Sequence, residues 1–209
     1  MGREFLWHHA AARRHLGCRS QQRLGGGYRG TIVKWNGVAW SAQTSGTMES
    51  IGKVWGTDAN SVWAVGTNGT ILRWDGSRWS SQVSGTTEHL TGIWGSDASN
   101  VWAVGNNGIV LRWNGVSWSR QSIGTTQSLN SVWGTDASNI WLWLPEGLLA
   151  RWNGKQWSLE SSGTTDSLYN LHGSDENNIW AVGWRGRILK WNGNPSLDFV
   201  GHLSSLGLR

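Results

Sequence analysis

Apolar residues recur along this chain in short runs, and each run ends at a turn signal. In the stretch 89–127 the runs are 90–94, 101–104, 109–113 and 117–121. Gly, Asn and Asp stand between them, and these residues favour tight turns because they tolerate a left-handed backbone or bond to their own chain. Short apolar runs bounded by such turn residues are typical of strands. The stretch therefore predicts four short strands.

The connections between these runs indicate how the strands pair. Asn114-Gly115 is a strong two-residue hairpin signal, and Gly108 suits a turn that needs a positive φ. None of the connections is long enough for a crossover helix. Neighbouring strands must therefore be antiparallel.

The four-strand pattern repeats every 39 residues, and tryptophan marks the register. Four separate series keep this spacing, with His172 in the fourth place of the third series. Repeated four-stranded units of about forty residues are typical of β-propeller blades. The series are Trp35, Trp74, Trp113, Trp152 and Trp191; Trp40, Trp79, Trp118 and Trp157; Trp55, Trp94 and Trp133; and Trp63, Trp102, Trp141 and Trp180.

The predicted fold class is therefore all-β, a propeller of four-stranded antiparallel blades. The repeats cover 30–193, between an irregular basic tail at 1–29 and an irregular tail at 194–209. The repeats begin with half a blade, and Ser196 stands where the next tryptophan is expected. Four blades, five blades, or an incomplete propeller that self-associates through open blade edges all fit this pattern.

The tryptophan content has a structural interpretation. The chain has 19 Trp but only two Phe and two Tyr. A lone blade cannot bury both faces, so stacked blades are expected to bury most of these rings. A Lys or Arg precedes each tryptophan of the first series, and its aliphatic stem is expected to cover a ring. The alternative is a ring of cations for an anionic partner. The cations are Lys34, Arg73, Arg112, Arg151 and Lys190.

Charge argues against a nucleic-acid partner. The net charge is +5, and residues 1–30 contain six Arg and one Glu, so the remainder is balanced. A neutral repeat body lacks the electrostatic footprint of nucleic-acid binding. No apolar run reaches the length of a membrane span, and Arg and His interrupt any signal-peptide core near the start.

A carboxylate recurs in the first turn of each repeat, at Asp58, Asp97, Asp136 and Asp175. Such a ring could suggest a metal site, but an Asp that caps its own turn explains the period better. No His or Cys pair stands at ligand spacing in the repeats. Neither a metal nor a cofactor is predicted.

The repeat pattern I-W-G-x-D…V-W-A-V-G-x-x-G-x-I-L-R-W-D/N-G-x-x-W resembles bacterial propeller repeats of the BNR/Asp-box and photosystem II stability factor-like kind. Tryptophan-rich forms resemble repeats in secreted or surface proteins of bacteria such as myxobacteria. The segment 101–118 also resembles tectonin repeats, which form carbohydrate-binding propellers. The resemblance implies an extracellular or cell-surface place, although no signal peptide is visible.

The chain departs from the catalytic members of that group. Only Asp75-Gly76 followed by Trp79 echoes the Asp-box, whose Asp and Trp stabilise a hairpin. Sialidases of this type use an arginine cluster with a tyrosine and acids, and Tyr28 and Tyr169 have no such setting. The resemblance therefore implies no enzyme, and a BNR-type glycoside hydrolase is the least favoured alternative.

Candidate ligand-binding residues lie where similar repeats differ, in the turn between the second and third strands. This turn is expected to share a face with the blade-to-blade connections. Trp184 beside Arg185 has the composition of a binding hot spot, unless Trp184 folds onto its neighbouring blade. Trp143 replaces a valine and is read as an interior size change. The candidates are Asn68, Asn107, Glu146, Trp184 and Arg185.

These observations predict a non-catalytic recognition or scaffold propeller that binds a protein or glycan partner. A tectonin-like lectin with repeated sugar pockets is the main alternative.

Overall fold

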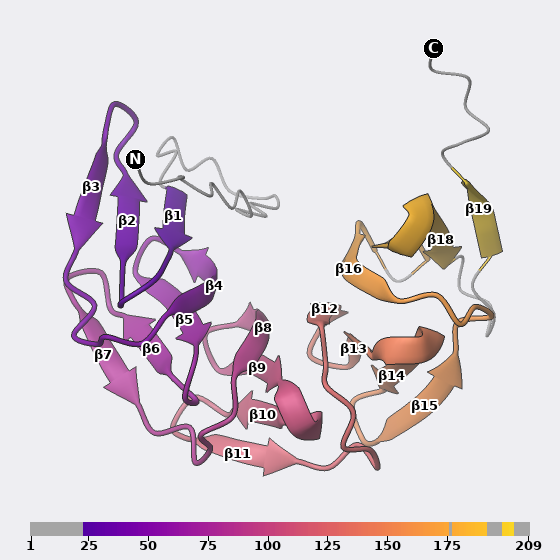
Figure 1. Cartoon of the computed structure of the whole chain (residues 1–209). Helices are drawn as coiled ribbons and strands as arrows, with labels where there is room; N and C mark the ends of the chain where they lie inside the picture. Colours follow the sequence, from indigo (N-terminus) through magenta and orange to yellow (C-terminus); the bar gives the residue numbers. More distant parts are fainter. Residues whose placement is uncertain (1–22, 176, 192–197, 203–209) are drawn as a thin grey trace. The chain divides into compact units, whose positions relative to one another are not determined.

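The computed structural model describes residues 23–175, 177–191 and 198–202, and they form an all-β structure (Figure 1). Five sheets are present, and in each of them consecutive strands are neighbours. Four sheets have four strands and the first has three, which confirms the predicted four-stranded antiparallel blades. The chain divides into two compact units, residues 1–90 and 91–209, each of which is described by itself.

The first unit contains blade 1, made of β1–β3, and blade 2, made of β4–β7. Its strands are β1 (Arg23–Gly26), β2 (Ile32–Trp35), β3 (Trp40–Gln43), β4 (Ile51–Asp58), β5 (Ser61–Gly66), β6 (Ile71–Trp74) and β7 (Trp79–Gln82).

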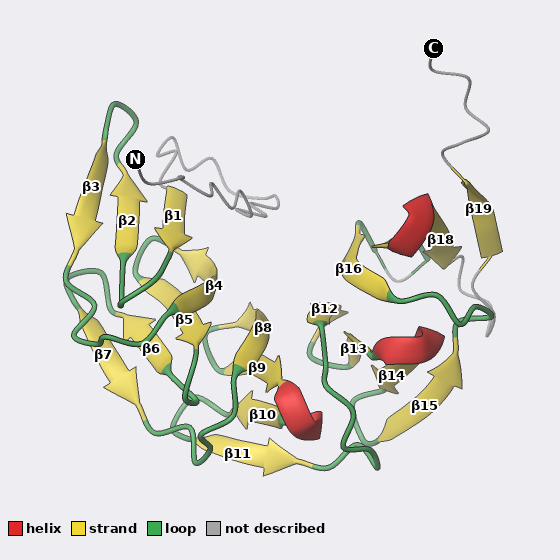
Figure 2. Cartoon of the chain, viewed as in Figure 1, coloured by secondary structure: helices red, strands yellow, loops and turns green. Residues whose placement is uncertain are grey.

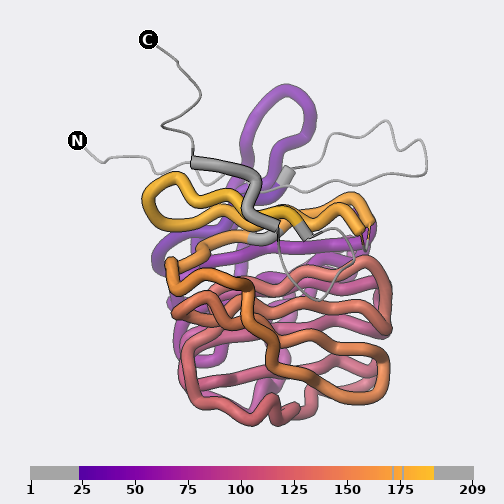
Figure 3. Tube along the Cα trace, turned by 90° about the vertical axis from the view of Figure 1, so that its right-hand side faces the viewer, coloured from indigo at the N-terminus to yellow at the C-terminus, as the bar shows by residue number. Residues whose placement is uncertain are grey.

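The second unit contains blade 3 (β8–β11), blade 4 (β12–β15) and blade 5 (β16–β19), with Leu90 at the boundary between the units. Figure 3 shows the hairpin connections at the ends of its strands. The strands are β8 (Leu90–Asp97), β9 (Asn100–Gly105), β10 (Val110–Trp113), β11 (Trp118–Gln121), β12 (Ser131–Asp136), β13 (Asn139–Trp143), β14 (Leu148–Trp152), β15 (Trp157–Ser161), β16 (Leu168–Gly173), β17 (Ile179–Gly183), β18 (Arg187–Trp191) and β19 (Asp198–His202).

The first strand of a blade is longer than its apolar run. In blade 2 the pairing passes from Gly56↔Val62 to Asp58↔Ser61 through a register shift. A Cβ on Gly56 would approach the carbonyl oxygen of Ser61 at 2.9 Å, so glycine allows this close approach. The bulge lets the strand continue to the aspartate, three residues beyond the tryptophan where the run had been expected to end.

Two strands lie in segments that carry no tryptophan repeat. β1 falls within 1–29 and pairs with β2, and β19 falls within 194–209 and pairs with β18. A strand pairs through backbone groups, so it can add to a sheet without the side chains that mark the repeat. With β1 and β19 included, the described residues form five blades, one of the two blade numbers that the sequence allowed.

The core lies between neighbouring sheets. In the second unit Trp102 of blade 3 packs on Trp152 and Trp157 of blade 4, with ring centroids 5.5 and 5.3 Å apart. Trp141 and Trp143 of blade 4 are buried in a cluster with Leu168 and other residues of blade 5. These contacts confirm that tryptophan holds the blades together, and that Trp143 is an interior residue.

A second use of tryptophan is within the blade. The indole Nε1 of Trp74 donates a hydrogen bond to the carbonyl oxygen of Ala59 at 3.1 Å. Trp113 and Trp152 make the same bond in their own blades, to Ala98 and Ala137. The bond ties the end of the third strand to the first turn of the blade, which explains why this series is so regular.

Three short turns among the described residues are drawn red in Figure 2, and the central residue of each has a left-handed backbone, not a helical one. They are η1 (Asn106–Gly108), η2 (Pro145–Gly147) and η3 (Trp184–Gly186). In this part of the chain no helix is long and apolar enough to cross a membrane.

Candidate functional site

The turn between the second and third strands has one backbone geometry in all five blades. Its second residue has a left-handed φ, between 51° and 57°, and a glycine with positive φ follows. The amide of the fourth residue donates to the carbonyl oxygen of the first, as from Thr70 to Thr67 at 3.0 Å. These features define a type I′ turn. The second residues are Arg29, Asn68, Asn107, Glu146 and Arg185.

Hydrogen bonds hold these turns against the blade-to-blade connections. The amide of Gly69 donates to the carbonyl oxygen of Glu88 at 2.8 Å, and Gly30 donates to Glu49 in the same way. A Cβ on Gly69 would collide with the carbonyl oxygen of Thr86, so glycine is required there. In blades 1 and 2 the turn and the connection are therefore held together at one end of the blade, the end that the sequence had predicted they share.

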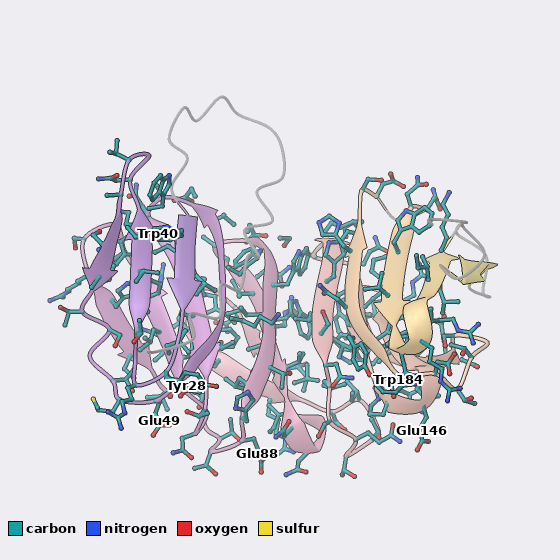
Figure 4. The ribbon with its side chains drawn as sticks, turned by 45° about the horizontal axis from the view of Figure 1, so that its top comes forward. Tyr28, Trp40, Glu49, Glu88, Glu146 and Trp184 are labelled. Carbon is teal, nitrogen blue, oxygen red and sulfur yellow. The ribbon has the colours of Figure 1, made fainter. Side chains whose placement is uncertain are left out.

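The predicted ligand-binding residues all lie in these turns. Asn68 is exposed in the first unit, and Asn107, Glu146, Trp184 and Arg185 are exposed in the second. Figure 4 shows Glu146 and Trp184 at the same end of the second unit. The side chain of Trp184 is 55% exposed.

In the first unit a carboxylate organises the turn. Glu49 accepts hydrogen bonds from Thr67 Oγ1 at 2.5 Å and from Asn68 Nδ2 at 3.0 Å. The bonds from Thr67 and then from Asn68 lower the pKa of Glu49, because they favour its ionised form. The Asn68 side chain is thus held in one position, where it presents its remaining polar groups to solvent.

In the second unit an ion pair occupies the corresponding place. Arg187 Nε donates to Asp166 Oδ2 at 2.6 Å, and both side chains are largely buried. The bond ties the connection before blade 5 to the strand that follows the Trp184 turn. Trp184 and Arg185 therefore project from a fixed base.

Sequence reasoning missed one pair of exposed residues in the first unit. Tyr28 and Arg29 occupy the turn positions of Trp184 and Arg185, four repeats earlier, and Tyr28 is 81% exposed. Figure 4 shows Tyr28 and Glu49 at one end of the first unit and Trp40 at the other. The 39-residue spacing would have found the pair if the register had been continued before residue 30.

The aspartates of the first turns are structural. Asp97 Oδ1 accepts a hydrogen bond from the amide of Ser99 at 2.8 Å, and the other three accept the same bond. The side chains of Ser174 and then Asn178 donate to Asp175 and lower its pKa. This confirms the turn-capping interpretation. No group of three His, Cys, Asp or Glu that could hold a metal ion occurs among the described residues.

The cations of the third strands cover tryptophan rings. Lys34 Nζ lies 5.1 Å from the ring centroid of Trp74, and the guanidinium of Arg112 lies 5.2 Å from that of Trp102. Arg73, Arg151 and Lys190 lie over rings in the same way. The predicted packing role is therefore confirmed.

Open depressions flank two of the turns. One in the first unit is lined by Asn68, Gly69 and Thr70 and by residues 81–87. The other, in the second unit, is lined by Gly108 and by residues 120–126. Each depression therefore lies beside the second residue of its turn, Asn68 in one and Asn107 in the other.

No family model matches this chain, and no curated protein matches it. Several solved structures, however, are similar to this chain. One described as "YCF48 bound to D1 peptide" is 18% identical with a TM-score of 0.64, over 89% of this chain and 69% of that chain.

Two WD40 or related structures are similar as well. The C-terminal WD40 domain of Sif2 is 16% identical with a TM-score of 0.65, over 87% of this chain and 57% of that one. The structure of U3-55K is 11% identical with a TM-score of 0.70, over 84% and 59%. This chain thus spans only 57% to 69% of the three solved chains. The sheets and these likenesses together identify its fold as a β-propeller.

Proposed function

We propose that this propeller is a non-catalytic recognition module that binds a protein partner through the type I′ turns of its blades. One observation carries the proposal. Five turns share one backbone geometry, yet the exposed residue at the second position is Arg, Asn, Asn, Glu and Arg in successive blades. A rigid scaffold that presents varied side chains from its loops is the usual basis of a binding surface.

The chemistry of the turns supports a protein partner. Tyr28-Arg29 in the first unit and Trp184-Arg185 in the second each combine an exposed aromatic ring with a guanidinium. Tyr, Trp and Arg dominate the energetics of protein interfaces. Because the turns are hydrogen-bonded to the connections beside them, little conformational entropy is lost when they bind.

A structural neighbour gives further support. The YCF48 propeller is described as bound to a peptide, and it shares this chain's fold over most of the chain's length. A peptide segment of a partner protein is the corresponding ligand here. The resemblance of the repeats to those of bacterial secreted or surface proteins suggests that the partner is met outside the cell.

A glycan is the second candidate ligand, as in a tectonin-like lectin. The observation that favours it is the exposure of Tyr28 at 81% and of Trp184 at 55%, since exposed rings stack on the apolar faces of sugars. Both candidates use the same turns, so one set of variants tests both.

Selection from a random peptide library and a glycan array, each probed with the full chain, tests the proposal. Peptides selected by the wild type are expected to bind the Trp184→Ala and Tyr28→Ala variants at least about tenfold more weakly, since truncating a hot spot costs ~2 kcal/mol or more.

Val116→Ala is the matched control. Val116 is 84% exposed but lies in the hairpin between the third and fourth strands of blade 3, away from the type I′ turns. Peptides that bind wild type and all three variants equally would remove the turn face as the site. Binding to glycans alone, lost in Trp184→Ala, would favour the lectin.

A further inference from the structure

Two contacts between blades, that of blades 1 and 2 in the first unit and that of blades 3 and 4 in the second, join two different faces. One, the second-strand face, carries the tryptophan and the apolar residue two positions later on the second strand of a blade. The other, the tryptophan-pair face, carries the tryptophans that end the third strand and begin the fourth. In the second unit, Trp102 on the second-strand face of blade 3 packs on Trp152 and Trp157, the pair face of blade 4. Arg112 Cζ also lies 5.8 Å from the ring centroid of Trp152.

The first unit uses the same arrangement. Leu24 of blade 1 stands where the other blades have the second-strand tryptophan, and it packs on a cluster that contains Trp74 and Trp79 of blade 2. Lys34 of blade 1 lies over the Trp74 ring at 5.1 Å. A second-strand face and a cation therefore meet a tryptophan pair in both units.

Blade 5 presents a second-strand face that is uncovered. Trp180 is 40% exposed, whereas Trp63, Trp102 and Trp141 at the same position are 0 to 2% exposed. Val182 is 45% exposed, whereas its equivalents Val65, Val104 and Trp143 are 0 to 1% exposed. The residue type cannot explain this difference in exposure, because blades 2 to 5 all have tryptophan at the position of Trp180.

Blade 1 presents the complementary face, also uncovered. Trp40 is 44% exposed, whereas Trp79 at the same position is 8% exposed. The pair is nevertheless already formed. The centroids of Trp35 and Trp40 are 5.6 Å apart at an interplanar angle of 50°, the same values as for Trp74 and Trp79.

The cation of the interface is in place on blade 5 too. Lys190 Nζ lies 5.5 Å from the ring centroid of Trp180, as Arg112 Cζ lies 5.2 Å from that of Trp102. The chain thus carries both unequal halves of an interface that it builds between its own blades, and both halves are exposed to solvent.

We propose that a second copy of this chain covers these faces, so that the second-strand face of blade 5 in one copy docks on the Trp35–Trp40 pair of blade 1 in another. The contact is head-to-tail, because the two faces differ. It continues the blade-to-blade packing already present in each unit.

Head-to-tail docking can be tested with two variants, each of which lacks one of the two faces. Trp180→Lys destroys one face and Trp40→Lys the other, because each replaces a ring by a second cation near Lys190 of the interface. Each variant alone should be monomeric. An equimolar mixture should form a dimer and nothing larger, because only the intact Trp180 face of one variant and the intact Trp40 face of the other can pair.

Sedimentation velocity at several concentrations measures this, with the wild type expected to form dimers or larger species. Trp184→Lys is the matched control, since this ring lies in a turn outside both faces and its loss should leave association unchanged. Circular dichroism checks the fold of each variant. Should a Lys variant fail to fold, Trp180→Ala and Trp40→Ala repeat the test, each expected to raise the dissociation constant at least about tenfold.

A wild type that stays monomeric at all concentrations would overturn the proposal, and so would a mixture that does not associate. A monomer in which Trp180 is shielded from a soluble quencher would point instead to closure within one chain. Because Trp184 is untouched in the mixed variants, this outcome is independent of the ligand binding proposed above.

Discussion

At the residue scale, one turn in each of blades 1 to 4 is fixed by a single side-chain oxygen. Asp75 Oδ1 accepts hydrogen bonds from the amides of Ser77 and Arg78 at 2.8 and 2.9 Å and from the Ser77 hydroxyl at 2.7 Å. In three other blades an asparagine accepts the same two amide bonds, at Asn36, Asn114 and Asn153. Asp75 is therefore the one ionisable member of this turn series.

Asp75→Asn should keep the fold and remove one source of acid sensitivity. The bonds from Arg78 and Ser77 lower the pKa of Asp75 from 3.8 to about 2. A depressed pKa stabilises the folded state above pH 3.8, and this contribution is lost as the pH falls from 3.8 through about 2. The free energy of unfolding, measured against pH, should fall more steeply in wild type than in Asp75→Asn across that window. A carboxyl resonance of Asp75 that titrates near 3.8 would show that the bonds do not form in solution.

At the element scale, the type I′ turns owe their geometry to glycine for two separable reasons. Gly69 has a φ of 62°, and its missing Cβ makes room for the carbonyl oxygen of Thr86. Gly85, in the connection after blade 2, has a φ of 73°, but an added Cβ there would meet nothing within 4 Å. The two positions share the left-handed backbone and differ in the close approach.

Gly69→Ala is therefore expected to destabilise the protein more than Gly85→Ala does. A left-handed alanine costs ~1 kcal/mol at either position. At Gly69 the collision with Thr86 adds to this, for a total of about 2–4 kcal/mol. Urea denaturation followed by circular dichroism measures both, and equal losses would mean that the connection moves aside freely.

The 39-residue period made the elements predictable, and its limits explain what was missed. Runs such as 101–104 and 109–113 correspond closely to β9 and β10, because a strand buried on both faces reads as a short, nearly continuous apolar run between turn residues. The extension of β4 to Asp58 was not predicted, since it depends on a backbone bulge that leaves no apolar pattern. β19 was missed for a similar reason, because it joins the sheet through backbone pairing. The candidate turns were located correctly, but the exposure of Trp184 could only come from the packing of its neighbours.

At the scale of the whole molecule, a propeller behaves as a series of blades that stabilise one another through nearest-neighbour contacts. In the second unit blade 4 is covered on both faces, since Trp102 packs on its tryptophan pair while Trp141 and Trp143 are buried against blade 5. Blade 5 has Trp180 and Val182 exposed on its far face. The two blades have related sequences, so their difference in stability should reflect coverage.

Native-state hydrogen exchange should therefore rank the blades by coverage. Local opening is easier where fewer apolar contacts must be broken. In a dilute, monomeric sample the amides of β13 and β14 should exchange at least about tenfold more slowly than those of β17 and β18. Each factor of ten corresponds to ~1.4 kcal/mol of opening free energy, which is below the 1.5–3 kcal/mol typical of burying one large apolar side chain. Raising the protein concentration should then slow exchange in β17, because a docked copy buries Trp180, and leave β13 unchanged. Equal protection in all four strands would mean that blades 4 and 5 open as one cooperative unit, whose stability does not depend on which face is covered.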